Sequence, residues 1–328
     1  MLQKEEILDM MLKRLQGKFI GNYFIPNRTI DSIVYLWHYY GVIGGMTPEV
    51  GENDIGPLAD TEYEERTGRV KFYRERINIS DYTSRVTFRN VLNDKLDFLT
   101  DRMALRLEYL KVMGIVSNAY SSAQAENYYY HNCNTKGDHW IGGGGAVDIL
   151  SQFIDGCQRA SEYAKVRHDT AIMGTRLVAA LNKSVEWRDW ERKGPMSVQI
   201  AKEGGIIGTG WDPQGKLSQN TGKEVVTVDM PGSIGKIGGI EIFESNVSIL
   251  ADQSNTRSAL QPLLDRDVYF FKRGSDLGYA NVFLGIGVDE ERIKFAHKTE
   301  YQIETALKVN IHRPQFIYTI KNAIKLGA

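Results

Sequence analysis

Four residues whose side chains can bind a metal ion lie close together in the sequence: His131, Cys133, Asp138 and His139. Imidazole, thiolate and carboxylate groups are the ligands that zinc uses in proteins. Zinc sites usually combine one close group of ligands with a second group farther along the chain, and the sequence offers no matching second group. The segment is either a metal-binding loop or an exposed polar loop, and the missing second group favours the polar loop.

The glycine-rich stretch at residues 210–217 could bind a nucleotide, because it matches the first seven positions of the P-loop pattern. The next position should carry a hydroxyl that holds magnesium, but it is Leu217. Asp212 would repel phosphate, and Pro213 has no amide hydrogen to donate. Residues 218–222 also do not open a helix, as phosphate binding at a helix N-terminus requires. These departures favour a glycine turn, and a nucleotide-binding enzyme is kept only as the alternative from another functional class.

Two further glycine clusters, at residues 142–145 and 232–238, lack the Gly-x-Gly-x-x-Gly spacing of dinucleotide-binding loops. Both are interpreted as turns or hinges, although the first precedes a helical pattern and could hold an anion. The remaining histidines are scattered, and no Gly-x-Ser-x-Gly motif supplies a nucleophile. The sequence therefore predicts no catalytic residue, no cofactor-binding residue and no metal site. This absence, in a chain of this size with a long irregular N-terminal segment, favours an assembly protein over an enzyme.

The overall composition is that of a globular protein, with 328 residues, of which 42% are hydrophobic and 25% charged. The 40 Lys and Arg residues nearly balance the 41 Asp and Glu residues, so that the net charge is −1. Contacts with nucleic acid or an acidic membrane must therefore be local. The N-terminus lacks the pattern of a secretory signal, and Cys133 and Cys157 make no disulfide framework. We expect a protein made in a cytoplasm, with no membrane span.

The N-terminal third combines a short helical pattern with a long irregular segment. Apolar residues at helical spacing predict an amphipathic helix over residues 2–16. Residues 17–68 show no sustained period and many Gly and Pro residues, which is typical of functional loops or arms. Acidic residues at 49–65 are followed by basic residues on a predicted strand at 69–79. This pattern is either a solvated hairpin or an extended hairpin whose opposite charges meet a neighbouring copy of the chain.

The rest of the chain predicts helices followed by a β-rich region, which is an α+β arrangement. Leucines and methionines at helical spacing predict a long helix from Asn93 to about residue 117, which spans roughly 30 Å. Cys157 lies on the apolar face of the helix predicted at 146–164, where it is interpreted as a small core residue. The further predicted elements are a helix at 146–164, a strand at 169–174, a helix at 175–181, and strands at 224–228, 240–243, 268–271, 280–286, 301–309 and 316–320.

In this order the elements resemble the major capsid proteins of tailed viruses, which have the Hong Kong 97 (HK97-like) capsid fold. The segment 69–81 looks like the descending strand of the family's extended loop (E-loop), and 94–117 looks like its spine helix. Residues 146–184, 234–246 and 309–318 are similar to its peripheral domain, its axial domain and its closing strand. The resemblance implies these divisions: N-terminal arm 1–40, extended loop 41–90, spine helix and peripheral α/β domain 91–184, axial β-rich domain 185–265, and returning strands 266–328.

The resemblance also implies a function. Such a chain would self-assemble into hexamers and pentamers of an icosahedral shell around double-stranded DNA, as part of a virion assembled in the host cytoplasm. Portal protein and scaffold or decoration proteins would be its other partners, with no cofactor. Because no long helical segment precedes the arm, a separate scaffold protein, or none, is expected. An encapsulin-like compartment, which encloses cargo enzymes, is the alternative within the same fold.

Overall fold

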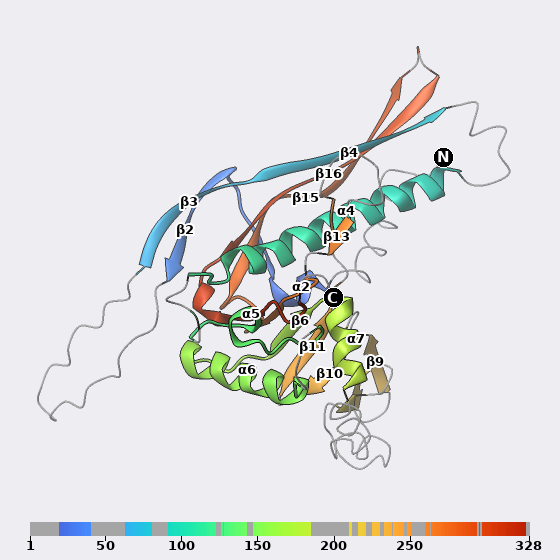
Figure 1. The fold of residues 1–328 in the computed structure, drawn as a ribbon. Helices are drawn as coiled ribbons and strands as arrows, with labels where there is room; N and C mark the ends of the chain where they lie inside the picture. The colour runs from blue at the N-terminus through green and yellow to red at the C-terminus, as the bar shows by residue number, and fades with distance from the viewer. Residues whose placement is uncertain are drawn as a thin grey trace, which may run out of the picture.

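The body of the fold consists of two main sheets and three main helices, with an N-terminal segment that packs between them (Figure 1). The amphipathic helix predicted at residues 2–16 lies outside the part of the chain that the structure describes. The computed structural model describes residues 20–40, 63–80, 91–122, 126, 128–142, 147–184, 210–211, 216–220, 225–229, 233–237, 239–245, 248–250, 260–262, 264–293, 295 and 297–325.

A long four-stranded sheet and one long helix form the first unit (Figure 1). The helix α4 (Val91–Asn118) lies against β4 (Lys71–Ser80) and β16 (Lys298–Ile311). The other strands of this sheet are β15 (Gly278–Ile293), antiparallel to β16, and β1 (Asn27–Thr29), parallel to β15. The leucines and methionines that predicted α4 fill its interface with the sheet. The buried core of this interface is Ile79, Leu96, Leu99, Met103, Val288, Tyr301 and Ile303.

A six-stranded sheet forms the second unit, and both of its faces are buried. Its order is β10-β11-β6-β14-β17-β5. Successive residues of each strand point to opposite faces, so a strand such as β14 (Val268–Phe271) contributes to two cores. The remaining elements of this unit are β5 (Tyr130–Asn132), α5 (Cys133–Lys136), α6 (Ile149–Ala164), β6 (Thr170–Met173), α7 (Thr175–Lys183), β10 (Ser233–Ile237), β11 (Ile240–Glu244), η4 (Pro314–Phe316) and β17 (Ile317–Lys321).

The two faces of this sheet meet different helices. One face, with Phe270 and Ile320, packs against Phe153 of α6 and Leu177 of α7. The other face, with Phe271, packs against α4 and the N-terminal segment. This one sheet contains strands that precede residue 184 in the chain and strands that follow it. The domain division at 184/185 stays a prediction.

Residues 20–25 of the predicted N-terminal arm contribute buried side chains to the core, and the arm over residues 1–40 stays a prediction. The short helix α2 (Gly21–Phe24) places the ring of Phe24 edge-on against Phe243 and Phe271, at centroid distances of 5.1 and 5.2 Å. Phe24 and Ile25 are fully buried. Residues 20–29 therefore join the two units, because their side chains fill the space between α4 and the six-stranded sheet.

The segment that the sequence analysis compares with the descending strand of the extended loop forms a strand of the four-stranded sheet. The strand β4 pairs with β16 along its whole length, from Lys71 opposite Leu307 to Ser80 opposite Lys298, and so belongs to the four-stranded sheet. The projecting hairpin instead consists of β2 (Val34–Tyr40) and β3 (Tyr63–Arg69) (Figure 1). Residues 41–62, which complete the predicted extended loop between these strands, lie outside the described residues.

Two small sheets complete the described strands. The first contains β7 (Gly210–Trp211), β8 (Lys216–Asn220) and β9 (Val225–Asp229), all antiparallel. The second pairs β12 (Ser248–Leu250) with β13 (Leu260–Pro262). Among the helices of the described ranges, none has the length and apolarity needed to cross a membrane.

Candidate assembly surface

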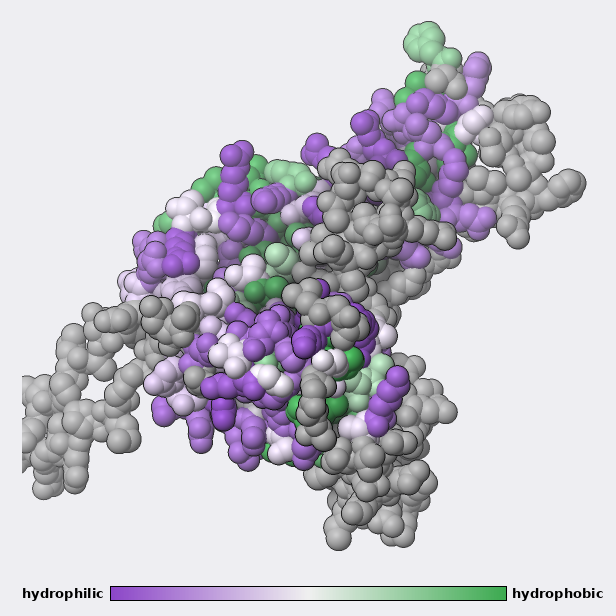
Figure 2. Space-filling view, viewed as in Figure 1, coloured by the Kyte–Doolittle hydropathy of each residue, from purple (hydrophilic) through white to green (hydrophobic). Residues whose placement is uncertain are grey.

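The hairpin β2–β3 projects from the body of the molecule (Figure 1). Its outer face carries exposed apolar side chains. Val34, Leu36 and Tyr63 are 52%, 66% and 56% exposed. Figure 2 shows apolar atoms interspersed with hydrophilic ones over this part of the surface. A two-stranded hairpin cannot bury both of its faces by itself, so this outer face is available to a partner.

The inner face of the hairpin packs against its own chain through three aromatic residues. Tyr35 Oη accepts a hydrogen bond of 2.6 Å from Asn310 Nδ2, and the ring of Trp37 lies edge-on to His312, with ring centroids 5.5 Å apart. Gly68 is required here, because a Cβ at this position would lie 2.5 Å from the ring of Tyr35. Arg66 covers the ring of Tyr39, with its Cζ 4.1 Å from the centroid.

The base of the hairpin is held by the turn that follows β16. His312 Nδ1 donates to the carbonyl of His38 at 2.6 Å, and the amide of Tyr40 donates to the carbonyl of His312 at 3.0 Å. The guanidinium of Arg313 lies over the ring of Tyr40, at 5.1 Å from its centroid. Burial lowers the pKa of His312, and the nearby charge of Arg28 adds to this effect, so the imidazole is neutral at neutral pH. The hairpin therefore leaves the body in a defined direction.

The described charges of this region find their partners within the chain. On the hairpin, Arg66 contacts Glu64 at 2.7 Å and His38 contacts Glu65 at 3.4 Å. On β4, the partners are across the sheet: Arg74 contacts Glu304 at 2.8 Å, and Arg76 contacts Glu300 at 3.9 Å. Arg74 and Arg76 therefore have acidic partners within the four-stranded sheet, and their contact with a neighbouring copy stays a prediction. The outward apolar residues of β2, which the sequence interpretation missed, are the better candidates for such a contact.

We expect the Arg74→Glu variant to lose no more than about 1 kcal/mol of unfolding free energy, because Arg74 is largely exposed and exposed ion pairs contribute little. Glu304→Arg in the same chain should restore part of the loss by reversing the pair. Urea unfolding of unassembled subunits measures both variants. A loss above about 3 kcal/mol for Arg74→Glu would show that the pair supports the sheet more strongly than its exposure implies.

Two buried side chains of opposite charge on α4 anchor the N-terminal segment. Glu108 Oε2 accepts from the amide of Gly21 at 2.8 Å, while Lys111 Nζ donates to the carbonyl of Ile25 and to Asn27 Oδ1, both at 2.8 Å. The two side chains belong to residues only 7% and 4% exposed. Burial raises the pKa of Glu108 and lowers that of Lys111 to about 8, and the attraction between the two charges opposes both shifts.

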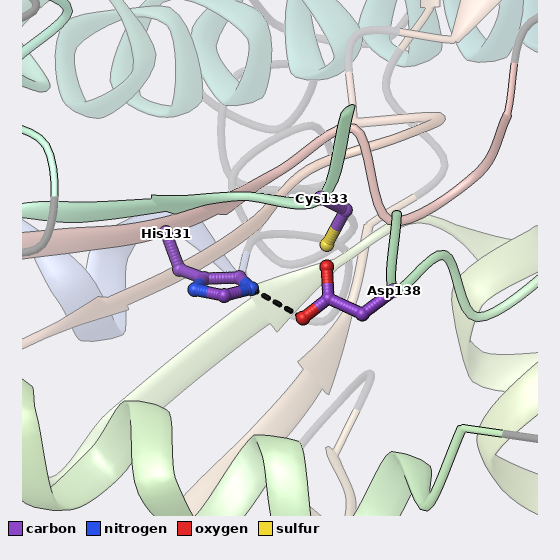
Figure 3. Close-up of side chains that lie close together, drawn as sticks. All are labelled: His131, Cys133 and Asp138. Atoms are coloured by element: carbon purple, nitrogen blue, oxygen red, sulfur yellow. Dashed lines mark hydrogen bonds and ion pairs between the residues drawn. The ribbon is translucent and has the colours of Figure 1, made fainter. Parts of the chain in front are cut away.

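In the loop of predicted metal ligands, residues 134–137 are exposed as expected, but the four ligand-type residues are buried or half-buried. His131 lies on β5, Cys133 begins α5, and Asp138 follows that helix (Figure 3). Cys133 is fully buried, and His131 Nε2 lies 2.7 Å from Asp138 Oδ2. His139 is not part of this group, because its Nδ1 lies 2.8 Å from the carbonyl of Asn322. Three of the four predicted ligand residues are therefore brought together.

At the two strongest glycine candidates, the described flanking residues do not have the arrangement of a phosphate-binding loop. Gly210 pairs with Ser218 in the antiparallel hairpin β7–β8, so its stretch joins two strands, whereas a P-loop leads from a strand into a helix. Gly142 has a φ of +79°, which is consistent with the predicted turn. The helix α6 that follows is capped by Asp148, whose Oδ1 accepts from the amide of Ser151 at 2.9 Å. A carboxylate at this helix end repels an anion.

His168 is a buried histidine that holds the connection before β6. Its Nε2 donates to the carbonyl of Phe316 at 2.9 Å, and the residue is 1% exposed. Burial lowers its pKa to about 4, although hydrogen bonds to the backbone of Phe316 and Val166 act in the opposite direction. The imidazole is therefore neutral in the folded protein at pH 7, and it has a structural role between β6 and η4.

We expect the stability of the subunit to fall by about 3 kcal/mol between pH 6.5 and pH 4 on account of His168. In this window the unfolded chain binds a proton at the imidazole while the folded chain does not, so stability is present above pH 6.5 and is lost as the pH falls. Urea unfolding as a function of pH measures the slope, and His168→Gln should flatten it. His297→Gln is the matched control at an exposed histidine. An unchanged slope in His168→Gln would contradict the assignment.

Comparison with known proteins identifies the fold. No protein-family model matches this chain, and no curated protein matches it by sequence. The structure is similar to a phage-related protein from Bordetella bronchiseptica RB50, with 9% identity, a TM-score of 0.58 and 98% of each chain covered. It is also similar to the capsid structure of the cyanophage P-SCSP1u, with 11% identity, a TM-score of 0.57, and 92% of this chain and 88% of that chain covered.

The mature capsid of bacteriophage PhiM1 shows the same similarity, with 8% identity, a TM-score of 0.54, and 94% of this chain and 86% of that chain covered. These matches cover nearly the whole chain. They confirm the predicted α+β class and the resemblance on which it rested. The chain has the HK97-like fold of the capsid proteins of tailed bacteriophages.

Proposed function

We propose that this chain is the major capsid protein of a tailed virus, and that it assembles into the hexamers and pentamers of an icosahedral shell. The observation that carries the proposal is the projecting hairpin β2–β3 with its exposed Val34 and Leu36, on a fold whose solved relatives include capsids. In a closed shell, the outer face of each hairpin contacts a neighbouring copy. Many such contacts, each weak, give a stable container through multivalency.

The same hairpin explains how the contact can be specific. Its inner face is fixed to the body by Tyr35, Trp37 and His312, so the outer face is presented in one orientation. A rigid, preorganised surface loses little conformational entropy when it binds. Subunits that meet through it therefore associate with a defined angle, which a closed shell requires.

The proposed content of the shell is double-stranded DNA, held without sequence-specific contacts. Small cations can neutralise packed DNA, so a chain with a net charge of −1 is compatible with this role. The proposal includes assembly in the host cytoplasm, residence in the virion, and contacts with a portal protein and with scaffold or decoration proteins. The proposed role is structural and not enzymatic.

Electron microscopy of the full chain after expression and sedimentation tests the proposal. We expect closed particles of uniform size, built from rings of five and six subunits. A chain that stays monomeric at all concentrations would contradict it. Nuclease treatment of particles from their natural source then identifies the content, because protected DNA supports a capsid, whereas a co-purifying enzyme supports the encapsulin-like compartment.

A further inference from the structure

The cluster of His131, Cys133 and Asp138 is the strongest group of ligand-type side chains among the described residues, and capsid assembly does not use it. One ligand atom from each residue lies within 4.8 Å of the other two. Figure 3 shows the Cys133 sulfur, the Asp138 carboxylate and the His131 ring turned toward a common point. The three residues are held there by β5 and α5, whose end is fixed by the left-handed Gly137, with a φ of +76°.

The side-chain amide of Gln152, on α6, lies at the centre of this cluster. Its Nε2 lies 2.7 Å from Asp138 Oδ2, 3.2 Å from His131 Nε2 and 3.8 Å from Cys133 Sγ. It also lies 3.4 Å from the backbone carbonyl of Asp138. The amide orientation is set by Trp140, whose Nε1 donates to Gln152 Oε1. Four acceptor atoms, three from side chains and one from the backbone, therefore surround the amide nitrogen of Gln152.

One amide group cannot satisfy these acceptors. It has two hydrogens for four acceptor atoms, and His131 Nε2 cannot accept from Gln152 while it donates to Asp138. Asp138 Oδ1 is also buried and accepts no hydrogen bond among the described residues. A cation interacts with all of these lone pairs at once, without the directional limits of two N–H bonds.

The distances in the cluster are close to those that a zinc ion requires. Ligand bonds of about 2.0–2.3 Å in tetrahedral geometry place the ligand atoms about 3.3–3.8 Å apart. The observed contact between His131 and Asp138, 2.7 Å, must open slightly, and the widest separation, at most 4.8 Å, must close slightly. Rotation of side chains can make both changes.

A cavity beside the cluster gives access to it. The cavity has a volume of about 320 Å³, and His131, Asp138 and Gln152 line it together with Asp148 and Asp155. This volume accommodates several water molecules. A water molecule can therefore supply the fourth ligand, after the Gln152 amide has turned away from the centre.

We propose that His131, Cys133 and Asp138 form a binding site for a zinc-type divalent cation. A thiolate, an imidazole and one carboxylate form a set of ligands that favours zinc over the harder magnesium and calcium ions. When the ion binds, the Cys133 thiol releases its proton and a sulfur–metal bond forms. Because this proton must leave before the sulfur–metal bond forms, binding tightens as the pH rises. The bound ion fastens β5 and α5 to each other.

Cobalt(II) chloride is the probe, added to the full chain after removal of metal with a chelator. A cobalt ion bound to a thiolate gives a charge-transfer absorption band in the near ultraviolet, which a structural polar cluster does not produce. We expect this band at one equivalent of cobalt, its loss on addition of zinc, and an increase in the melting temperature with zinc. Absence of the band would overturn the proposal.

Variants assign the band to its ligands. Cys133→Ser should abolish it, and Cys157→Ser is the matched control at the other cysteine, which lies on α6 outside the cluster. Because Cys133 is fully buried, Asp138→Asn provides a second test at a less buried position, with an expected loss of cobalt affinity of at least about tenfold. A band that survives in Cys133→Ser, or an affinity unchanged in Asp138→Asn, would contradict the site.

Discussion

Replacement of Glu108 by Ala is expected to lower the free energy of unfolding of the subunit by about 3–5 kcal/mol. The change removes the acceptor of the Gly21 amide, 2.8 Å away, and removes the nearby negative charge that favours the charged form of the buried Lys111. Removal of one member of a buried pair is costly because the remaining charge cannot return to water. The segment that α4 holds in place, residues 20–29, should detach first.

Urea unfolding of unassembled subunits measures this loss, and protease sensitivity near Gly21 reports the detachment. The double variant Glu108→Gln, Lys111→Met removes both charges, and it should be closer in stability to the unmodified chain than Glu108→Ala. Glu291→Ala is the control at an exposed carboxylate, with an expected change within about 0.5 kcal/mol. Equal effects of Glu108→Ala and Glu291→Ala would show that the pair does not anchor the segment.

The Leu36→Asp variant is expected to prevent formation of closed particles without changing the stability of the subunit. Leu36 is 66% exposed on the outer face of β2, so a carboxylate there remains hydrated in the isolated subunit. In the proposed shell the same carboxylate would be buried against a neighbouring copy, at a cost of several kcal/mol at every contact. Because each shell repeats the contact many times, the effect on assembly is large.

Sedimentation and electron microscopy measure the particles, and a melting curve of the unassembled subunit confirms that it still folds. Leu36→Met is the matched control, since it retains an apolar side chain of similar volume and should still assemble. Normal particles from Leu36→Asp would show that the outer face of the hairpin is not an assembly contact. In that case the proposed function would rest on the similarity of fold alone.

Local periodicity explains which elements the sequence could predict. The repeat of Leu96, Leu99 and Met103 on one side of a helix predicted α4, and these residues face the sheet as the repeat requires. Alternation predicted β16, in which Tyr301 and Ile303 are buried and their neighbours are less so. Both patterns arise because one side of the element faces the core and the other does not.

The hairpin strand β2 was missed for the opposite reason. Its sequence, from Val34 to Tyr40, is apolar or aromatic at nearly every position, so it has no alternation. One face contacts the chain's own body, through Tyr35 and Trp37, and the other remains exposed for a partner. A strand that needs apolar residues on both faces, one of them for another molecule, carries no period-2 signal.

By itself, the sequence determined the helices and strands with regular periods and the α+β class, because each depends on neighbouring residues. Only the tertiary structure decided that β4 pairs with β16, with Arg74 beside Glu304, and that Gln152 approaches His131. These contacts join residues far apart in the chain. The packing of complete helices and strands decides which of these residues meet, and the pattern of neighbouring residues in the sequence does not contain this information.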